Sequence, residues 1–168
     1  FMNVKDFKEI SKKDVGIAGG KGASLGEMTQ AGIPVPPGFV LLSDAFERFI
    51  EEMHLNAEID SILHKVKHED INSVENASEE IQSLILSREI PKDIASEIGE
   101  YFKKLGAIYV AVRSSATSED SASAAWAGQL DSYLNTTEKT LLENVKKCWA
   151  SLFTPRAIFY RIEKGLHK

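Results

Sequence analysis

Three segments of the sequence carry residue types that bind phosphate, and the first is Gly19-Gly20-Lys21-Gly22. Glycines let backbone N–H groups approach an anion, and the helix expected after them adds partial positive charge at its N-terminus. Lys21 would supply a mobile full charge beside them. The segment is not a P-loop, because that motif's four-residue spacer and Gly-Lys-Ser/Thr ending are both missing. It predicts a different kind of phosphate seat, and the alternative is a helix-entry turn with an exposed lysine.

The second segment runs from Val112 to Thr117 and reads VRSSAT. Arg113 stands where a predicted strand runs out into a loop, and a guanidinium there can grip two phosphate oxygens at once. Hydroxyl donors follow it at Ser114, Ser115 and Thr117. The alternative is a structural arginine paired with Glu119 or Asp120, and composition alone does not separate the two.

The third segment, WAGQLDS, covers residues 126–132. Gly128 stands between two strand-like stretches, which suggests a hairpin-like flap. Backbone amides in such a flap, at Gly128 and Gln129, would be able to cover a triphosphate. The alternative is an ordinary turn in which Trp126 is a loose core anchor.

The elements that must position these segments follow from hydrophobic periodicity and from glycine and proline. We expect a helix from Ala23 that stops at Gly32, a strand over 38–42, and a helix capped by Ser43. Residues 54–105 read as three helical pieces, the last with Pro91 at its first position and Gly106 as its stop. The pattern then predicts a buried strand over 107–112, a strand over 129–135, a helix from Leu141, and a last helix restarted at Thr154-Pro155 that carries Arg156 and Arg161. Surface or structural pairing is the interpretation for these last two arginines.

Helices punctuated by strands, without regular βαβ alternation, favour an α+β domain of one unit or two small lobes. The formal charge of -5, from 20 basic and 25 acidic residues, argues against a broad nucleic-acid footprint. The single cysteine, Cys148, falls on an apolar stripe and is interpreted as a small buried hydrophobe. No apolar run is long enough to cross a bilayer and no signal peptide is evident, so the cytoplasm is the expected location.

Five ordered motifs together resemble a known family: GGKGASLGEM, IPVPPGF, VRSSATSED, AGQLDSYLN and CWASLFTPRAIFYR. They are similar to the N-terminal pyruvate- and phosphoenolpyruvate-binding region of phosphoenolpyruvate synthase and pyruvate phosphate dikinase, a module that rifamycin phosphotransferases share. The resemblance covers roughly residues 14–50 and 107–163. It implies a helix-rich first lobe of an ATP-grasp fold, with a small mixed or antiparallel sheet.

The resemblance also implies roles for individual residues. Lys21 and Arg113 match the family's phosphate-binding lysine and arginine, and Gly128 matches the glycine of its flap. Ser132 falls where many relatives place a threonine that contacts nucleotide. The chain departs from the common pattern within the flap segment, at Ala122, Ala125 and Trp126.

In synthase relatives the β-phosphoryl group of ATP passes through a phosphohistidine domain to pyruvate. The resemblance implies that residues 1–168 are a fragment that is inactive alone. The second lobe with its Mg²⁺ ligands, the phosphohistidine domain and the acceptor domain would lie elsewhere in the same chain. Two alternatives stay open: the same lobe acting on a rifamycin-type antibiotic, and a stand-alone nucleotide-binding module without catalysis.

Overall fold

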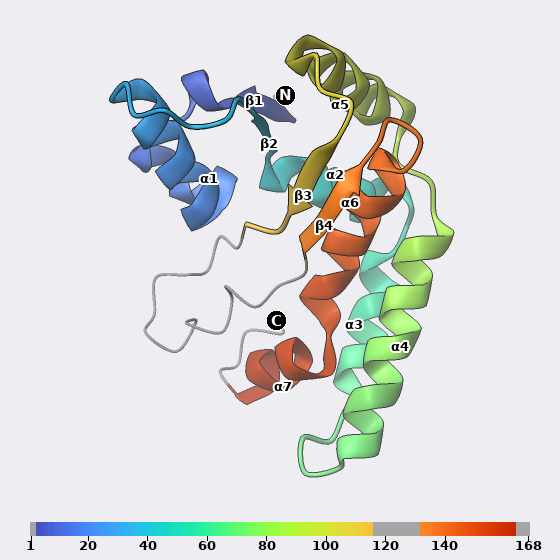
Figure 1. Cartoon of the computed structure of the whole chain (residues 1–168). Helices are drawn as coiled ribbons and strands as arrows, with labels where there is room; N and C mark the ends of the chain where they lie inside the picture. Colours follow the sequence, from blue (N-terminus) through green and yellow to red (C-terminus); the bar gives the residue numbers. More distant parts are fainter. Residues whose placement is uncertain (1–2, 116–131, 164–168) are drawn as a thin grey trace.

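The computed structural model describes residues 3–115 and 132–163. Within these ranges the chain is rich in helix and has two small antiparallel sheets, which confirms the predicted α+β class (Figure 1). The strands are β1 (Val4–Asp6), β2 (Phe39–Leu41), β3 (Val110–Arg113) and β4 (Ser132–Thr136). The helices are α1 (Val15–Gln30), α2 (Ser43–Glu52), α3 (Asn56–His64), α4 (Ile71–Ser87), α5 (Lys92–Leu105), α6 (Leu141–Ala150) and α7 (Pro155–Glu163). Short 3-10 turns are η1 (Phe7–Glu9), η2 (Lys12–Asp14) and η4 (Ser151–Phe153).

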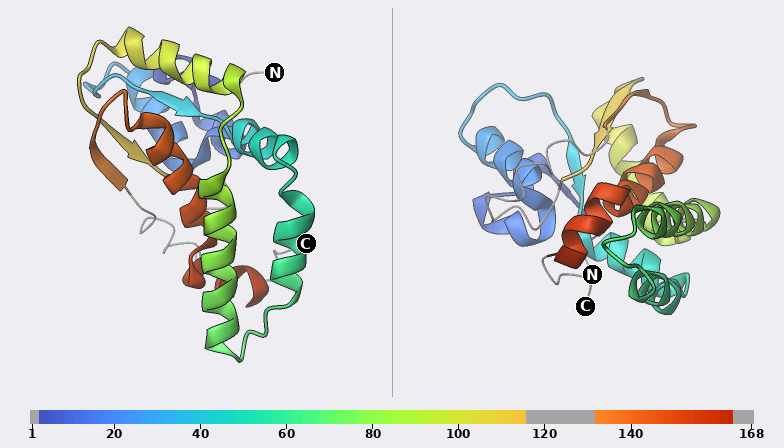
Figure 2. Two further views of the ribbon diagram at one scale, coloured as in Figure 1. Left: turned by 90° about the vertical axis from the view of Figure 1, so that its right-hand side faces the viewer. Right: turned by 90° about the horizontal axis from the view of Figure 1, so that it is seen from below.

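The main core lies between the amphipathic helices. On α4 the buried residues follow helical spacing, with Val74, Ala77, Ile81 and Ile85 on one face. This face packs against α6 and α7, and α4 itself runs along one edge of the molecule (Figures 1 and 2). None of the described helices is both long and apolar enough to cross a membrane.

The first helix packs unusually close to its neighbours because its inner face lacks side chains. Gly22 and Gly26 are one helical turn apart, and both are buried. A Cβ added at Gly22 would lie 3.2 Å from a methyl group of Val40 in β2, and one at Gly26 would lie 2.7 Å from Cβ of Ile10. These glycines therefore let α1 rest directly on β2 and on the segment that follows η1.

The β3–β4 pair is backed by α6 on one face. Arg113 is opposite Ser132 in the register. The Cys148 thiol of α6 lies 3.8 Å from the carbonyl oxygen of Val112, and the Asn144 side-chain amide donates to the Thr136 hydroxyl at 2.9 Å. Cys148 is buried, as predicted.

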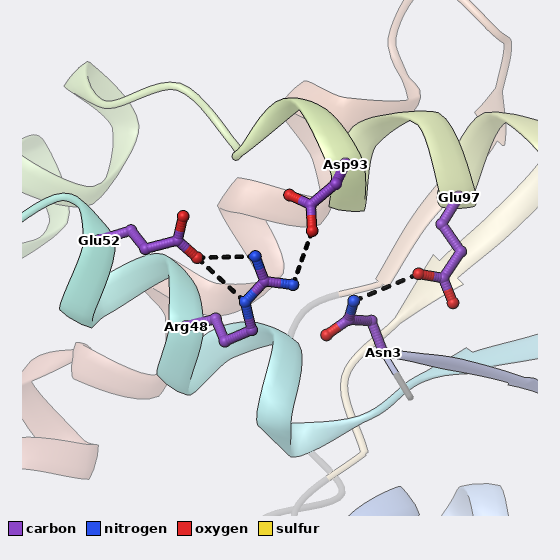
Figure 3. A network of polar contacts seen from close by, with 5 residues as sticks. All are labelled: Asn3, Arg48, Glu52, Asp93 and Glu97. Atoms are coloured by element: carbon purple, nitrogen blue, oxygen red, sulfur yellow. Dashed lines mark hydrogen bonds and ion pairs between the residues drawn. The ribbon is translucent and has the colours of Figure 1, made fainter. Parts of the chain in front are cut away.

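A polar network ties the β1–β2 sheet and α2 to α5 (Figure 3). The Arg48 guanidinium lies 2.8 Å from both the Glu52 and the Asp93 carboxylates, and its hydrogen bond is the main cause that lowers the pKa of Asp93. The buried Asn3 amide donates to Glu97 at 3.2 Å. The network fixes α5, whose end leads into β3.

The predicted strand over 107–112 was wrong in its start and in its burial. The strand begins at Val110, and the preceding side chains of Ile108 and Tyr109 are 76% and 61% exposed. Ala111 and Leu134 also face outward. The physical reason is that β3 pairs only with β4 among the described residues, and α6 covers one face, so alternate side chains meet solvent.

Where a helix start or stop was predicted, it lies within a residue or two of the observed one, apart from the start of the first helix. Gly106, with a φ of 66°, ends α5 as predicted, and the Thr154 hydroxyl accepts from the Ala157 N–H at the start of α7. Ser43 is not a cap, because α2 begins at Ser43 itself and no side chain caps it. Pro91 precedes the first residue of α5 instead of occupying it.

Candidate functional site

The glycine-rich segment forms a break within α1. Gly19 has φ 76° and ψ 167°, a combination open essentially to glycine alone, and the residues on both sides of it are helical. The sequence predicted a helix start at Ala23, but α1 starts at Val15. A second helical run begins just beyond Gly19. The predicted turn is thus present at Gly19, and Lys21, two residues later, is exposed.

Ser115 fastens this break to the end of β3. Its hydroxyl accepts from the Gly22 N–H at 3.0 Å and donates to the Ala18 carbonyl at 2.7 Å. Gly22 and Ser115 are 93 positions apart in the sequence. A Cβ on Gly19 would lie 2.5 Å from the Ser115 carbonyl oxygen, so only a glycine fits against the strand end. The first two predicted phosphate-binding segments are therefore in direct contact.

This contact gives the Ser115 hydroxyl a structural role in place of the predicted phosphate-binding role. Its hydroxyl carries one proton, and that proton is donated to Ala18. In this structure Ser115 is therefore a clamp that positions the glycine turn, and its proton is not directed toward a ligand. The Ser114 hydroxyl lies 3.4 Å from the Ser151 hydroxyl, at the limit of a hydrogen bond, and so joins the strand end to η4.

Arg113 and Ser132 lie side by side at the same end of the β3–β4 pair. They are register partners, and both side chains are exposed on the face away from α6. Thr117, Gly128 and Gln129, the other predicted site residues, lie outside the described ranges. Of the predicted set, the structure thus brings together the segments that carry Lys21, Arg113, Ser114, Ser115 and Ser132.

The described residues at this end include two exposed cations, Lys21 and Arg113. Within residues 3–115 and 132–163, neither Lys21 nor Arg113 forms an ion pair with a carboxylate. The helix start at Val15 adds nothing to this charge, because its N-cap residue is an acid, Asp14, and it precedes the Gly19 break. Two cations without a paired carboxylate among these residues favour an anion. The alternative pairing of Arg113 with Glu119 or Asp120 lies outside the described part of the chain.

The hydrogen bonds of Ser115 to the Gly19 turn were not predicted from the sequence, because no residue near Ser115 indicates a contact with a segment so far away in the chain. It also assigned Arg161 to ordinary pairing, whereas no acid pairs with it in the described structure. No group of three or more histidine, cysteine or acidic residues suited to a metal occurs among the residues that are described.

Replacing Ser115 by alanine is expected to lower the free energy of unfolding by about 1–2 kcal/mol, because two hydrogen bonds between α1 and the segment after β3 are lost. Urea denaturation followed by circular dichroism measures this change. Ser114→Ala is the matched control and should stay within about 0.5 kcal/mol of wild type, since the contact of its hydroxyl with Ser151 is long. Equal effects of the two changes would contradict the clamp.

A comparison with protein families identifies the class of domain. Residues 15–168 match the model of the pyruvate phosphate dikinase AMP/ATP-binding domain. The chain belongs to this family. The match includes the Gly19 break, β3, β4 and α7, so the elements that form the candidate site are all within it.

Curated relatives cover the same region. The chain is 46% identical to a probable phosphoenolpyruvate synthase of Methanothermobacter thermautotrophicus, over 95% of this chain and 24% of that protein. It is 49% identical to one of Methanocaldococcus jannaschii, over 94% of this chain and 14% of that protein. It is 42% identical to the phosphoenolpyruvate synthase of Helicobacter pylori, over 96% of this chain and 21% of that protein. The chain thus spans about a quarter or less of these relatives' length.

Proposed function

We propose that this chain is the ATP-binding N-terminal lobe of a phosphoenolpyruvate synthase. The observation that carries the proposal is the Ser115 clamp, which holds the Gly19 turn against the strand end where Arg113 faces Ser132. Membership of an AMP/ATP-binding family supports a nucleotide as the anion. The relatives named above, all called phosphoenolpyruvate synthases, support pyruvate over an antibiotic as the acceptor.

In this proposal each side chain has a role set by its chemistry. Lys21 and Arg113 bind phosphate oxygens, the first as a mobile point charge and the second as a planar fork. The Ser132 hydroxyl, adjacent to Arg113, is a further donor to the nucleotide. The Ser114 hydroxyl would donate to it by leaving its long contact with Ser151, whose own proton goes to the Cys148 carbonyl oxygen. Thr117 and the amides of Gly128 and Gln129 would close over the phosphates. Ser115 binds no phosphate directly and keeps the turn in place.

The proposed reaction consumes ATP, pyruvate and water and yields phosphoenolpyruvate, AMP and phosphate. Cations positioned around the phosphoryl oxygens stabilise the charge that develops during transfer. Mg²⁺ would share this task when bound, with ligands outside this chain. We propose that residues 1–168 are the first lobe of an ATP-grasp unit in a cytoplasmic protein, with the second lobe, the phosphohistidine domain and the pyruvate domain on the same polypeptide.

The test uses the complete protein that contains this chain. Incubation with ATP and pyruvate should form AMP, phosphate and phosphoenolpyruvate in equal amounts, measured by ion-exchange chromatography. A parallel incubation with a rifamycin in place of pyruvate should form no AMP. AMP formed only with the antibiotic would overturn the acceptor, and an absence of ATP binding by calorimetry would overturn the proposal as a whole.

A further inference from the structure

Arg161, in the last turn of α7, is a partly buried cation without an acid partner among the described residues. Its guanidinium carbon lies 4.6 Å from the centre of the Phe153 ring. Burial alone lowers the pKa of this arginine. In residues 3–115 and 132–163 no carboxylate pairs with it and no acceptor receives any of its five N–H groups.

This state is costly for a guanidinium. A cation removed from water is normally paired, because its desolvation is offset only by an opposite charge or by hydrogen bonds. The ring of Phe153 offers one face of π electrons, which attracts the cation but accepts none of its in-plane donors. The helix C-terminus is favourable for a positive charge, yet it too leaves the donors unused. The unused donors of the Arg161 guanidinium therefore favour binding of an oxyanion.

The position of Arg161 relative to the candidate site indicates which kind of anion it binds. Phe153, under the guanidinium, belongs to η4, and Ser151 at the start of η4 contacts Ser114, the residue after Arg113. Figures 1 and 2 place α7 on the side of the molecule at which β3 ends and β4 begins. Arg161 is thus connected through two contacts to the strand end that carries Arg113.

We propose that Arg161 binds a phosphate oxyanion and is a further phosphate-binding residue of this domain. Two ligands offer such a phosphate group: ATP, through its β- or γ-phosphate, and free inorganic phosphate. The first of these rests on the function proposed above, and the second does not. The planar guanidinium, already held against Phe153, would bind two phosphate oxygens without further ordering.

The experiment titrates ATP, AMP and inorganic phosphate separately into the complete protein by calorimetry. The variants are Arg161→Gln, which removes charge and fork, and Arg161→Lys, which keeps the charge. Arg88→Gln is the matched control, since Arg88 lies at the end of α4 with its guanidinium 3.9 Å from Glu58. Thermal denaturation of each variant without ligand is measured alongside.

Arg161→Gln is expected to weaken binding of ATP or of inorganic phosphate at least about 10-fold, with Arg161→Lys intermediate and Arg88→Gln unchanged. Weaker ATP binding with unchanged AMP binding identifies the β- or γ-phosphate. Weaker inorganic phosphate binding with unchanged ATP binding identifies free phosphate.

Affinities for ATP and phosphate that both stay within twofold of wild type in Arg161→Gln overturn the proposal. A drop in melting temperature with unchanged affinities also overturns it and indicates a carboxylate elsewhere in the protein as the partner. If the wild type binds no ATP, the proposed function fails while the phosphate titration still decides the role of Arg161. A wild type that binds neither ligand overturns both.

Discussion

Gly19→Ala should lower the free energy of unfolding by about 3 kcal/mol or more, because backbone strain and a steric clash act together. At φ 76° and ψ 167°, alanine is strained even in open space. Space is also lacking, since the added Cβ would lie 2.5 Å from the Ser115 carbonyl oxygen and 2.6 Å from its carbonyl carbon. These are backbone atoms of the segment just after β3, so they cannot turn aside as a flexible side chain would. Urea denaturation followed by circular dichroism measures the loss.

The control for this prediction is another glycine of the same helix. A Cβ added at Gly16 would meet no atom within 4 Å, and the φ of Gly16 is not positive. Gly16→Ala should therefore leave stability unchanged or raise it by about 0.5–1 kcal/mol, through the lower entropy of the unfolded chain. The functional consequence is separable, because displacement of α1 from β3 should also weaken ATP binding in Gly19→Ala but not in Gly16→Ala. Two alanine variants with equal stability would mean that the break at Gly19 is not required.

Arg113→Gln should reduce AMP formation from ATP and pyruvate by at least about 100-fold in the complete protein, as expected for a lost charge contact to the transferring phosphates. The side chain is exposed at the strand end and has no acid partner among the described residues. Its removal should therefore cost little stability, which separates a loss of function from a loss of fold. The rate of AMP release is measured by chromatography under saturating pyruvate.

Lys21→Met and Ser115→Ala are the variants to compare with Arg113→Gln. Lys21→Met, at the other exposed cation, should also reduce the rate, and a melting temperature close to wild type should accompany both changes. Ser115→Ala should instead lower stability and raise the ATP concentration needed for half-maximal rate, because it loosens the turn without removing a charge. Near-normal turnover of Arg113→Gln would reject a role for this arginine in phosphate binding.

Local patterns were sufficient for most helices of this chain. The stripe on α4 and the stop at Gly106 rest on helical spacing and on the left-handed conformation of one residue. Both are properties of a few neighbouring residues. Burial of the strand before Arg113 was mispredicted, because an apolar run looks the same whether it is covered on one face or on two.

The sequence by itself determined the residue types that suit phosphate, namely the glycine-rich turn with Lys21 and the strand end with Arg113. It also determined the alternating pattern of the second strand, which pairs with the strand that carries Arg113. Only the tertiary structure decided that Ser115 donates its proton to Ala18, that Gly19 must lack a side chain, and that Arg161 lies without an acid among the described residues. For Ser115 and Gly19 the physical reason is distance along the chain. A hydrogen bond or a clash between residues 93 or more positions apart depends on how whole elements pack, and no local pattern encodes it.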